Sequence, residues 1–486
     1  MYNLAAFTVQ EARDKCGVFG VYAPGRDVSR ITYYSLFALQ HRGQESSGIA
    51  VASDRHIVCY KDMGLVQQVF DEEILMMMKG DAAIGHNRYS TTGGSTKINA
   101  QPVMIENEDD PSRTIAVAHN GNLVNTWELA TELVNLGRPP SSTSDTEMLG
   151  LLLVHEWESG KSFDDALLAA LKRVRGAYSL VILTTNGLYA VRDPHGVRPL
   201  ALGKFDGGHV VASESAAFSI VGGEYLREVE PGEAVRLDAG GIHSLPFAKP
   251  RIHMCMFEYF YFCRPDTLLR DKETYAMRVE MGRRLAQEAP VEADVVTPVP
   301  DSGVPAAIGY AVESHIPYHE ALVKNRYVGR TFIEPLQAQR ELGVRMKLNP
   351  LREVIEGKRV VLVDDSIVRG STSRQIVKML RMAGAREVHM RLSSPPIKYP
   401  CYYGIDFGTY EELIAAGRSL EEINEMVGAN TLHYLSLEGV VAATGLPSGE
   451  FCLACFNNQR PIPVPEQMKI GKFILEGSQA PKRTLQ

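Results

Sequence analysis

The sequence lacks the features of a membrane or secreted protein. No apolar run approaches the roughly 18 residues needed to cross a bilayer. The first 15 residues have neither the basic start nor the apolar core of a secretory signal, and they include Glu11 and Asp14, unlike an Arg-rich transit peptide. We therefore expect a cytoplasmic protein that has no membrane partner.

An excess of basic residues is also missing. Lys and Arg number 51 against 58 Asp and Glu, which gives a net charge of −7. A general nucleic-acid binder would show a strong basic bias, so we expect no nucleic-acid partner, although a local basic pocket for phosphates remains compatible. With 486 residues, 45% of them hydrophobic, the chain suits two to four globular domains.

Cysteine is scarce, with seven residues spread along the chain. Without a secretory signal, disulfides are improbable. An odd number of widely spaced cysteines indicates a mixture of catalytic, metal-binding and plain buried thiols.

Two different rhythms divide the chain. Residues 16–250 place short strands first and last around a helical middle, which predicts a layered α+β domain. Strands are expected at 16–23, 46–53, 114–121, 178–185, 187–193 and 209–213, and helices at 31–40, 125–134, 146–157 and 162–174.

Residues 251–455 alternate helices with Val-rich strands, which predicts βαβ units and a parallel-sheet α/β domain. Helices are expected at 273–289, 304–315 and 371–384, and strands at 293–300, 316–323, 358–365 and 385–393. The long polar stretch 327–351 would be either a disordered loop or a functional lid. The Pro-rich tail 456–486 should lie over the surface.

The sharpest local motif is VVLVDDSIVRGST at residues 360–372, where a buried strand runs into Asp364 and Asp365. Gly370 allows a tight turn, and Ser371 and Thr372 then open a helix whose first N–H groups can bind an anion. Carboxylates beside such a cradle suit ribose hydroxyls or a magnesium ion. A helix N-cap is the simpler alternative, but a cap needs one acid rather than two followed by this turn.

A second strand ends in Pro-Asp-Ser-Gly at residues 300–303, about 60 residues before the acid pair. On its own this sequence also suits an ordinary turn. Together the two motifs resemble the type I phosphoribosyltransferases. The resemblance implies that Asp301, Ser302 and Gly303 form a pyrophosphate loop for phosphoribosyl pyrophosphate, and that Ser302 and the acid pair hold magnesium.

The basic stretch 324–347 could fold over that pyrophosphate and exclude water, with Lys347 contacting the substrate. The other basic residues of this stretch are Lys324, Arg326, Arg330, Arg340 and Arg345. The alternative is a solvated charged loop.

Cys16 opens an apolar strand, where a cysteine is by default a small buried hydrophobe. Three polar, Gly-containing clusters at 41–48, 85–93 and 118–123 each follow an apolar segment, and they would converge if the strand ends share one rim. This set resembles the glutaminase domain of the N-terminal-nucleophile amidotransferases.

The resemblance implies that Cys16 is the nucleophile and that its own α-amine is the general base, because an α-amino pKa of about 7.7–8.0 suits neutral pH. Residues 1–15 would then be a propeptide, removed by cleavage between Lys15 and Cys16. Without cleavage the nitrogen of Cys16 is an amide, which cannot act as a base.

Further roles follow from the same resemblance. Arg88 would bind the α-carboxylate of glutamine, and Asp145 its α-ammonium group. Asn120 and the backbone of Gly121 would form the oxyanion hole, and Gly43 would let the backbone approach the ligand. The plain alternatives are a surface salt bridge for Arg88 and a helix N-cap for Asp145.

Four further thiols come from three regions of the chain: Cys255, Cys401, Cys452 and Cys455. Four thiolates suit a zinc site or an iron–sulfur cluster, and spacing alone does not choose between them. Cys263 is a competing ligand, and Cys59 is expected to be a core thiol. The contexts of these cysteines resemble one branch of the glutamine phosphoribosylpyrophosphate amidotransferases, which holds a cubane 4Fe-4S cluster at matching positions. The resemblance implies that cluster in a structural role.

From Cys16 to about residue 460, the chain resembles the glutamine phosphoribosylpyrophosphate amidotransferases. The resemblance implies the first step of purine synthesis, in which glutamine, water and phosphoribosyl pyrophosphate give phosphoribosylamine, glutamate and pyrophosphate. It also implies a homotetramer and feedback inhibition by purine nucleotides. The alternatives are a sugar-phosphate or asparagine-forming amidotransferase, a regulatory nucleotide binder without turnover, and a zinc-binding interaction protein.

Overall fold

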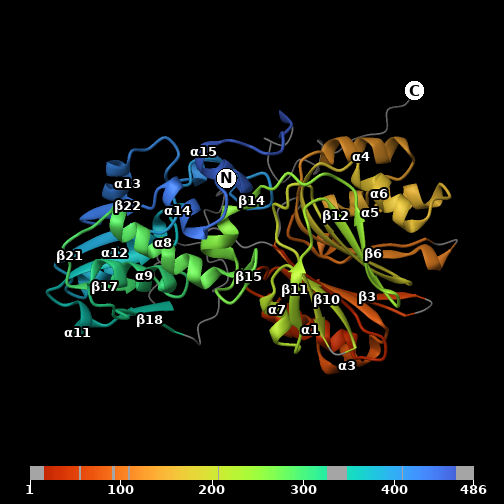
Figure 1. Ribbon diagram of the computed structural model, residues 1–486, viewed down its shortest axis with the longest axis horizontal. Coiled ribbons are helices and arrows are strands. Elements are labelled where there is room, and N and C mark those ends of the chain that lie inside the picture. Colours follow the sequence, from red (N-terminus) through yellow and green to blue (C-terminus); the bar gives the residue numbers. More distant parts are fainter. Residues whose placement is uncertain are drawn as a thin grey trace, which may run out of the picture.

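The computed structural model describes residues 16–53, 56–89, 94–107, 110–205, 207–325, 347–407 and 409–466. Figure 1 shows two lobes, one built from the first half of the chain and the other from the second half. The expected propeptide (1–15), most of the basic stretch (326–346) and most of the expected tail (467–486) lie outside the described residues. In the part that is described, no helix is both long and apolar enough to span a membrane.

The first lobe contains two antiparallel sheets. One has the strand order β11-β9-β10-β1-β4-β2-β3, and the other has the order β13-β12-β8-β7-β6-β5. The strands are β1 (Gly17–Tyr22), β2 (Ser46–Ala52), β3 (Ile57–Met63), β4 (Ala82–Arg88), β5 (Val103–Ile105), β6 (Ile115–Leu123), β7 (Gly176–Thr184), β8 (Gly187–Arg192), β9 (Ala201–Phe205), β10 (Gly208–Ala212), β11 (Glu224–Glu228), β12 (Glu233–Asp238) and β13 (Gly241–Pro246).

Alternation along these strands produces four layers. Residues such as Val18, Ile84 and Val181 form an apolar layer between the two sheets. The outer face of the first sheet carries α1 (Val28–Ala38), α2 (Val66–Val69), α3 (Glu72–Met77) and α7 (Ala216–Ser219). The outer face of the second carries α4 (Thr126–Asn135), α5 (Asp145–Glu158) and α6 (Phe163–Leu171). The predicted layered α+β arrangement is confirmed.

The second lobe is built on a four-stranded parallel sheet in the order β17-β20-β21-β22. Its strands are β17 (Val295–Pro298), β20 (Arg359–Asp364), β21 (Glu387–Leu392) and β22 (Thr431–Tyr434). Alternate β20 residues face opposite sides: Val361 and Val363 pack with α8 (Thr274–Glu288) and α9 (Val304–Ser314). Val360 and Leu362 pack with α12 (Ser371–Met382) and α13 (Leu420–Val427). This confirms the predicted parallel-sheet α/β fold.

One predicted strand is wrong. Residues 316–323 do not join the parallel sheet, and only one bridge links Tyr318 to Val296. The next rung would require an N–H from Pro298, which a proline lacks. The end of this segment instead forms β18 (Leu322–Lys324), which pairs with β19 (Leu348–Pro350) in a separate ribbon.

The beginning and end of the second lobe meet in a short parallel pair. β14 (Met254–Cys255) pairs with β23 (Phe451–Cys452), with Cys255 opposite Cys452. The π-helix η3 (Glu258–Phe262) follows β14, and α15 (Ala454–Asn457) follows β23. This pairing brings three of the cysteines into one region.

Candidate active sites

Cys16 lies immediately before β1, and its side chain is buried. Its thiol donates to the carbonyl oxygen of Tyr89 at 3.2 Å, just beyond the end of the neighbouring strand β4. β1 and β4 are paired, with Gly17 opposite Asn87. Sheet register therefore places the thiol beside the polar cluster that ends β4.

Burial raises the pKa of the Cys16 thiol to about 11. The hydrogen bond with Tyr89 and the charge of Arg88 lower the pKa, whereas the charges of Glu45 and Asp145 raise it. These three charged side chains therefore surround the predicted nucleophile. At neutral pH the thiol is protonated, so a reaction at Cys16 requires a base that removes this proton.

Arg88 is buried at the end of β4, and one of its terminal nitrogens lies 3.6 Å from a Glu45 carboxylate oxygen. The same guanidinium donates to the carbonyl of Gly94 at 3.2 Å. It is thus not the exposed surface salt bridge considered as the alternative. The backbone of Gly43 lies close to the backbone of β4. A Cβ added to Gly43 would lie only 2.5 Å from the Asn87 carbonyl oxygen.

Asn120 and Gly121 lie side by side in β6. Asn120 is almost fully buried, and its Nδ2 has no hydrogen-bond partner among the described residues. Gly121 has φ +152°, and an added Cβ would lie 2.0 Å from the carbonyl oxygen of Ala177. A buried amide donor without a partner, next to a backbone that only glycine fits, suits an oxyanion hole.

Asp145 is the first residue of α5 and is buried. One carboxylate oxygen accepts the N–H of Leu123 at 3.0 Å, and the other lies 3.6 Å from Nδ1 of His119. Although burial opposes ionisation, His119 and these hydrogen bonds lower the pKa of the Asp145 carboxyl. Ser144 rather than Asp145 occupies the N-cap position, so the carboxylate is available as an anionic group beside Cys16.

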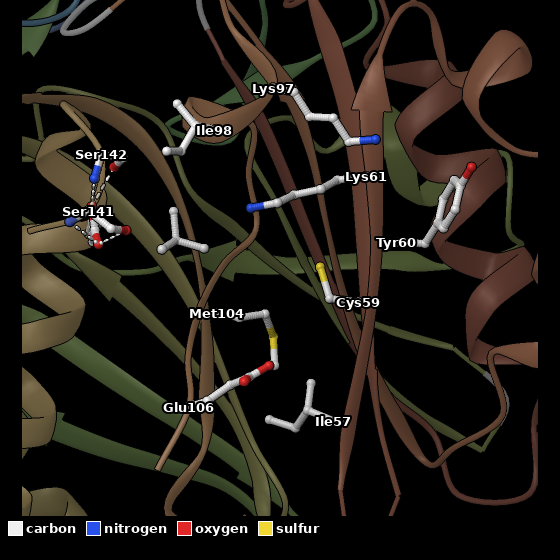
Figure 2. Close-up of a pocket in the computed structure, with 12 residues that line it drawn as sticks. Ile57, Cys59, Tyr60, Lys61, Lys97, Ile98, Met104, Glu106, Ser141 and Ser142 are labelled. Carbon is white, nitrogen blue, oxygen red and sulfur yellow. Dashed lines mark hydrogen bonds between the residues drawn. The ribbon is translucent and has the colours of Figure 1, made fainter. Parts of the chain in front are cut away.

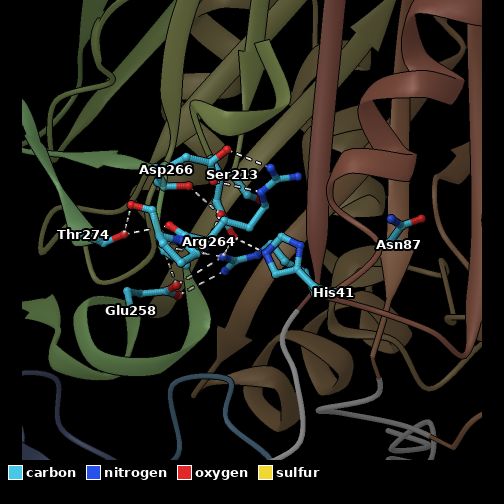
Figure 3. Close-up of polar contacts among 12 residues, drawn as sticks. His41, Asn87, Ser213, Glu258, Arg264, Asp266 and Thr274 are labelled. Carbon is cyan, nitrogen blue, oxygen red and sulfur yellow. Dashed lines mark hydrogen bonds and ion pairs between the residues drawn. The ribbon is translucent and has the colours of Figure 1, made fainter. Parts of the chain in front are cut away.

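A buried arginine, to which the sequence pattern assigned no role, contacts the backbone of Cys16. Arg42 donates through Nε to the Cys16 carbonyl oxygen at 3.1 Å. Its terminal nitrogens bind Glu214 at 2.5 Å and Glu258 at 3.1 Å. Glu214 also lies 2.7 Å from Nε2 of His41, and Figure 3 labels His41 and Glu258 among the polar contacts of this region. The only sequence signal for Arg42 is its place in the HRG cluster.

In the second lobe, Asp364 ends β20 and Asp365 follows it, and both are buried. Burial raises the pKa of the Asp365 carboxyl, while a hydrogen bond from the Ser302 side chain lowers it. The amide of Val299 donates to the Val363 carbonyl at 2.8 Å, where β17 and β20 run in parallel. The two motifs predicted from sequence thus meet at the carboxyl edge of the sheet.

The predicted phosphate cradle has the expected backbone. Gly370 has φ +80° and lies at the N-cap of α12, and among the described residues no side chain caps that helix start. Ser371 and Thr372 form its first turn. Gly303 packs closely against the backbone of β20, because an added Cβ would lie 2.5 Å from the Val363 carbonyl oxygen. A helix start without a side-chain cap, close after the acid pair, is what an anion site requires. In the other loop the N–H of Gly303 donates to the Val299 carbonyl at 3.0 Å.

The remaining residues predicted for this site are more peripheral. The Asp301 side chain is exposed and forms an ion pair with Lys324. Lys347 precedes β19, and its carbonyl accepts the N–H of Asn325 at 2.8 Å. The other basic residues of the expected lid (326–346) lie outside the described part of the chain.

Four predicted thiols line one small cavity between the lobes: Cys255, Cys401, Cys452 and Cys455. Arg198 and Arg460 line the same cavity. Within the described residues, no three His, Cys, Asp or Glu side chains converge closely enough to hold a single metal ion. The cavity therefore gathers four thiols around a common space rather than around one point.

Burial and one neighbouring arginine set the electrostatic environment of these four thiols. Burial raises the pKa of all four. Cys255 and Cys401 raise the pKa of Cys452 and Cys455 further. Arg198 acts in the opposite direction, lowering the pKa of Cys255, Cys401 and Cys452. Arg198 is fully buried, and its Nε has no hydrogen-bond partner in the described residues. A thiolate-bound anionic cluster would match this buried positive charge.

Two other cysteines lie elsewhere. Cys263, the competing ligand, does not line the cavity, and its thiol donates to Glu258 at 3.3 Å. Cys59 was expected in the core, but it is only half-buried on the edge strand β3. β3 alternates between half-buried and exposed residues, and Cys59 packs against the margin of the apolar layer between the two sheets.

A separate cavity of about 400 Å³ opens between β3 and the segment before α5 (Figure 2). Lys61 and Cys59 come from β3, Met104 from β5, and Ser141 and Ser142 from the α5 side. None of the residues predicted for either active site lines it. Lys61 donates to the carbonyl oxygens of residues 100 and 102, so its ammonium group is already hydrogen-bonded to the neighbouring backbone.

The lobes touch directly beside the oxyanion residues. Asn122 donates to the Tyr402 carbonyl at 3.0 Å, and the Tyr89 hydroxyl donates to Asp406 at 3.2 Å. An added Cβ on Gly404 would lie 3.0 Å from the Gly121 carbonyl. The segment after Cys401 therefore packs against the glutamine site.

Comparisons with known proteins agree with this architecture. A family described as glutamine amidotransferase domain matches residues 86–219. The amidophosphoribosyltransferase of Mycobacterium tuberculosis is 52% identical over 474 residues, covering 96% of this chain and 89% of the relative. That of Synechococcus elongatus is 50% identical over 468 residues, covering 95% and 94%.

A solved structure extends the agreement to three dimensions. Glutamine phosphoribosylpyrophosphate amidotransferase from B. subtilis, complexed with ADP and GMP, matches with a TM-score of 0.87 and 47% identity. The match covers 93% of this chain and 98% of the B. subtilis chain. Sequence and structure agree over nearly the full length of both lobes, and the chain belongs to the amidophosphoribosyltransferase family.

Proposed function

We propose that this chain hydrolyses glutamine at Cys16 and transfers the ammonia to C1 of phosphoribosyl pyrophosphate, in the first step of de novo purine synthesis. The products are phosphoribosylamine, glutamate and pyrophosphate. Family membership supports the overall reaction. The first half-reaction is supported mainly by one observation: the charges of Arg88, Glu45 and Asp145 act on the buried Cys16 thiol. Asn120, whose Nδ2 has no hydrogen-bond partner among the described residues, supports the proposed oxyanion hole.

In the first half-reaction, removal of residues 1–15 gives Cys16 a free α-amine. This amine takes the thiol proton, because an α-amino pKa of about 7.7–8.0 matches neutral pH whereas the thiol pKa is about 11. The sulfur then attacks the side-chain amide carbon of glutamine. The amine returns the proton to the leaving ammonia, and water later releases glutamate from the thioester.

The surrounding residues bind and orient the substrate. Arg88 binds the α-carboxylate of glutamine, replacing its contact with Glu45, and Asp145 binds the α-ammonium group. Asn120 Nδ2 and the N–H of Gly121 donate to the oxyanion of the tetrahedral intermediate. Gly43 holds the HRG cluster against the end of β4, so that Arg88 keeps its place.

In the second half-reaction, the acid pair binds the ribose of phosphoribosyl pyrophosphate. The loop of Asp301, Ser302 and Gly303 binds its pyrophosphate, and Gly370, Ser371 and Thr372 bind its 5-phosphate. Lys347 approaches the pyrophosphate from the β19 side. Magnesium, held by Ser302, Asp364 and Asp365 together with the substrate, would neutralise charge on the leaving pyrophosphate. Ammonia attacks C1 of the ribose as pyrophosphate leaves.

The four-thiol cavity suits a 4Fe-4S cluster with Cys255, Cys401, Cys452 and Cys455 as ligands. A cubane is wider than a single zinc ion, and its ligands need not converge on one point. When bound, the cluster would act as a structural cross-link, since neither half-reaction moves an electron. It would join the two ends of the second lobe to the segment that packs on Gly121.

The remaining proposals concern assembly and control. We propose a cytoplasmic homotetramer that purine nucleotides inhibit by feedback. The B. subtilis relative was solved with ADP and GMP, which supports nucleotide binding in a protein of the same fold. Analytical ultracentrifugation and inhibition assays with purine nucleotides test these two points separately.

Intact mass and N-terminal sequencing of anaerobically purified protein test the propeptide. The expected mature chain begins at Cys16. The Cys16→Ala variant should then lose glutamine-dependent phosphoribosylamine formation and keep the ammonia-dependent reaction. An active enzyme that still begins at Met1 would contradict the nucleophile assignment and leave an ammonia-using phosphoribosyltransferase.

A further inference from the structure

The backbone of Cys16 is bound by Arg42, a charged residue that has no role in the proposed chemistry. Arg42 donates to the Cys16 carbonyl at 3.1 Å and is only 1% exposed. The orientation of this guanidinium therefore influences where the nucleophile sits. A planar guanidinium keeps a fixed direction only when its other donors are also bound.

The second lobe supplies two of those bonds. Glu258, in η3, accepts from both terminal nitrogens of Arg42, at 3.1 and 3.2 Å. The two residues are 216 positions apart in sequence, and both are almost fully buried. Glu258 also lies three positions after Cys255, whose thiol accepts the N–H of Glu258.

Arg198 continues the chain of contacts to the four-thiol cavity. Its Nη1 lies 3.5 Å from a Glu258 oxygen, and its Nη2 donates to the Tyr403 carbonyl. Arg198 itself lines the cavity, and its Nε has no partner among the described residues. A buried N–H donor without a partner is costly, so it points to a group that the cavity would contain.

We propose that Glu258 and Arg198 form a positioning relay, through which the four-thiol cavity fixes the backbone of the nucleophile Cys16. The relay runs from the cavity to Arg198, then to Glu258, Arg42 and the Cys16 carbonyl. It rests on the proposed role of Cys16, and its residues touch neither glutamine nor the reacting atoms. Glutamine hydrolysis therefore depends on the state of the cavity more strongly than phosphoribosyl transfer does.

Three variants test the relay in the mature protein, which begins at Cys16. Glu258→Gln keeps the shape of the side chain but weakens its hold on Arg42, and Arg198→Gln disconnects the cavity. Glu228→Gln is a matched control, because Glu228 forms a buried pair with Arg192 at 2.7 Å and makes no bond to Arg42. Each variant is assayed with glutamine and with ammonia as nitrogen donor.

Two readouts do not depend on turnover. The rate at which iodoacetamide alkylates Cys16, followed by mass spectrometry, reports the position and reactivity of the Cys16 thiol. Iron per chain and visible absorption report whether the cavity is intact. A merely structural role would lower both reactions together with the iron content.

For Glu258→Gln we expect the glutamine-dependent kcat to fall about 10- to 100-fold, because a small displacement of a reacting group has effects of this size. The ammonia-dependent rate and the iron content should stay within about twofold. Arg198→Gln acts through Glu258, so its effect should be roughly threefold to tenfold. In both variants the alkylation rate of Cys16 should change, whereas Glu228→Gln should leave all readouts within about twofold.

The relay is rejected if Glu258→Gln leaves the glutamine reaction unchanged, or if it lowers both reactions equally. If Glu258→Gln does not fold, Glu258→Asp retains the charge at a longer distance and should show the same selectivity with a smaller loss. Cys16→Ala, assayed in parallel, separates this inference from the proposed function. A normal glutamine reaction in Cys16→Ala refutes the function itself, whereas a normal reaction only in Glu258→Gln refutes the relay.

Discussion

The two candidate active sites are built in opposite ways. Residues of the glutamine site lie in or beside strands and are buried, with Arg88 2% and Asn120 1% exposed. The phosphoribosyl site lies at the ends of parallel strands and on the loops that follow them. Its acid pair is buried, but the Asp301 side chain on one of these loops is 74% exposed. Sheet register fixes the first site before substrate arrives, whereas the second is left open for a large charged ligand.

The difference matches the chemistry that each site must perform. Hydrolysis of glutamine depends on placing one sulfur and one oxyanion hole accurately, which a rigid two-sheet scaffold provides. Phosphoribosyl transfer depends on enclosing a highly charged substrate, which needs loops that can close over it. Variants in one site should therefore separate the two half-reactions, and the predictions that follow test this separation.

The largest effect is expected for Cys16→Ala. Loss of a covalent nucleophile in comparable enzymes lowers kcat about 10⁶-fold, and we expect a glutamine-dependent loss of at least about 10⁴-fold. Because Cys16 belongs to the first lobe only, the ammonia-dependent rate should stay within about twofold. Steady-state assays with the two nitrogen donors measure both quantities. An equal loss with ammonia would show that the sites are not separable.

Asn120→Ala should have the next largest effect. Removing one oxyanion donor lowers kcat by about 10²- to 10³-fold, with little change in the KM for glutamine. Arg88→Lys provides the contrast, because it should mainly raise the KM by weakening the grip on the α-carboxylate. The kcat and KM of the glutaminase reaction decide between these outcomes. A KM effect alone in Asn120→Ala would remove this residue from the oxyanion hole.

Asp365→Asn should show the reverse selectivity. Its carboxylate is buried beside Ser302 and is proposed to hold the ribose and magnesium. We expect phosphoribosylamine formation to fall about 10²-fold with either nitrogen donor, while glutamine hydrolysis alone persists. Parallel assays of glutamate and pyrophosphate release measure the two halves. Retention of pyrophosphate release would contradict the assignment of the acid pair.

The two sites also differ in how much of each could be predicted from sequence. The phosphoribosyl motifs are local, since a strand, two acids and a glycine turn follow one another within residues 360–372. Their meeting with residues 300–303 then follows from parallel pairing of β17 and β20. The fold of both lobes could be predicted equally well, because the order of the predicted strands and helices changes sharply near residue 250.

The contacts that connect the lobes could not be predicted in this way. Arg42 and Glu258 are far apart in sequence, and charged residues in a sequence normally indicate a solvated surface. Their burial depends on the packing of η3 against the first lobe, which no local pattern encodes. The strand predicted at 316–323 was wrong for a related reason, since the limiting proline, Pro298, belongs to the neighbouring strand.

The last prediction concerns the pH dependence of stability rather than catalysis, and it starts from a buried aspartate in each lobe. Burial raises the pKa of both Asp193 and Asp365, and that of Asp193 reaches about 6 although it accepts N–H groups from Tyr178, His195 and Val197. The folded state therefore holds a proton on Asp193 at a pH where the unfolded state has released it. The stability that this proton gives is fully present below about pH 4 and is lost as the pH rises to 6.

A rise of this size in the pKa of Asp193 corresponds to about 3 kcal/mol. The difference in free energy of unfolding between the wild type and Asp193→Asn should therefore move by about 3 kcal/mol in favour of the variant between pH 4 and pH 7. Other carboxyl groups titrate alike in both proteins and cancel in this difference. Urea unfolding of the two proteins at each pH measures it. A constant difference would show that Asp193 has the same pKa in the folded and unfolded states, because its three N–H donors then offset the effect of burial.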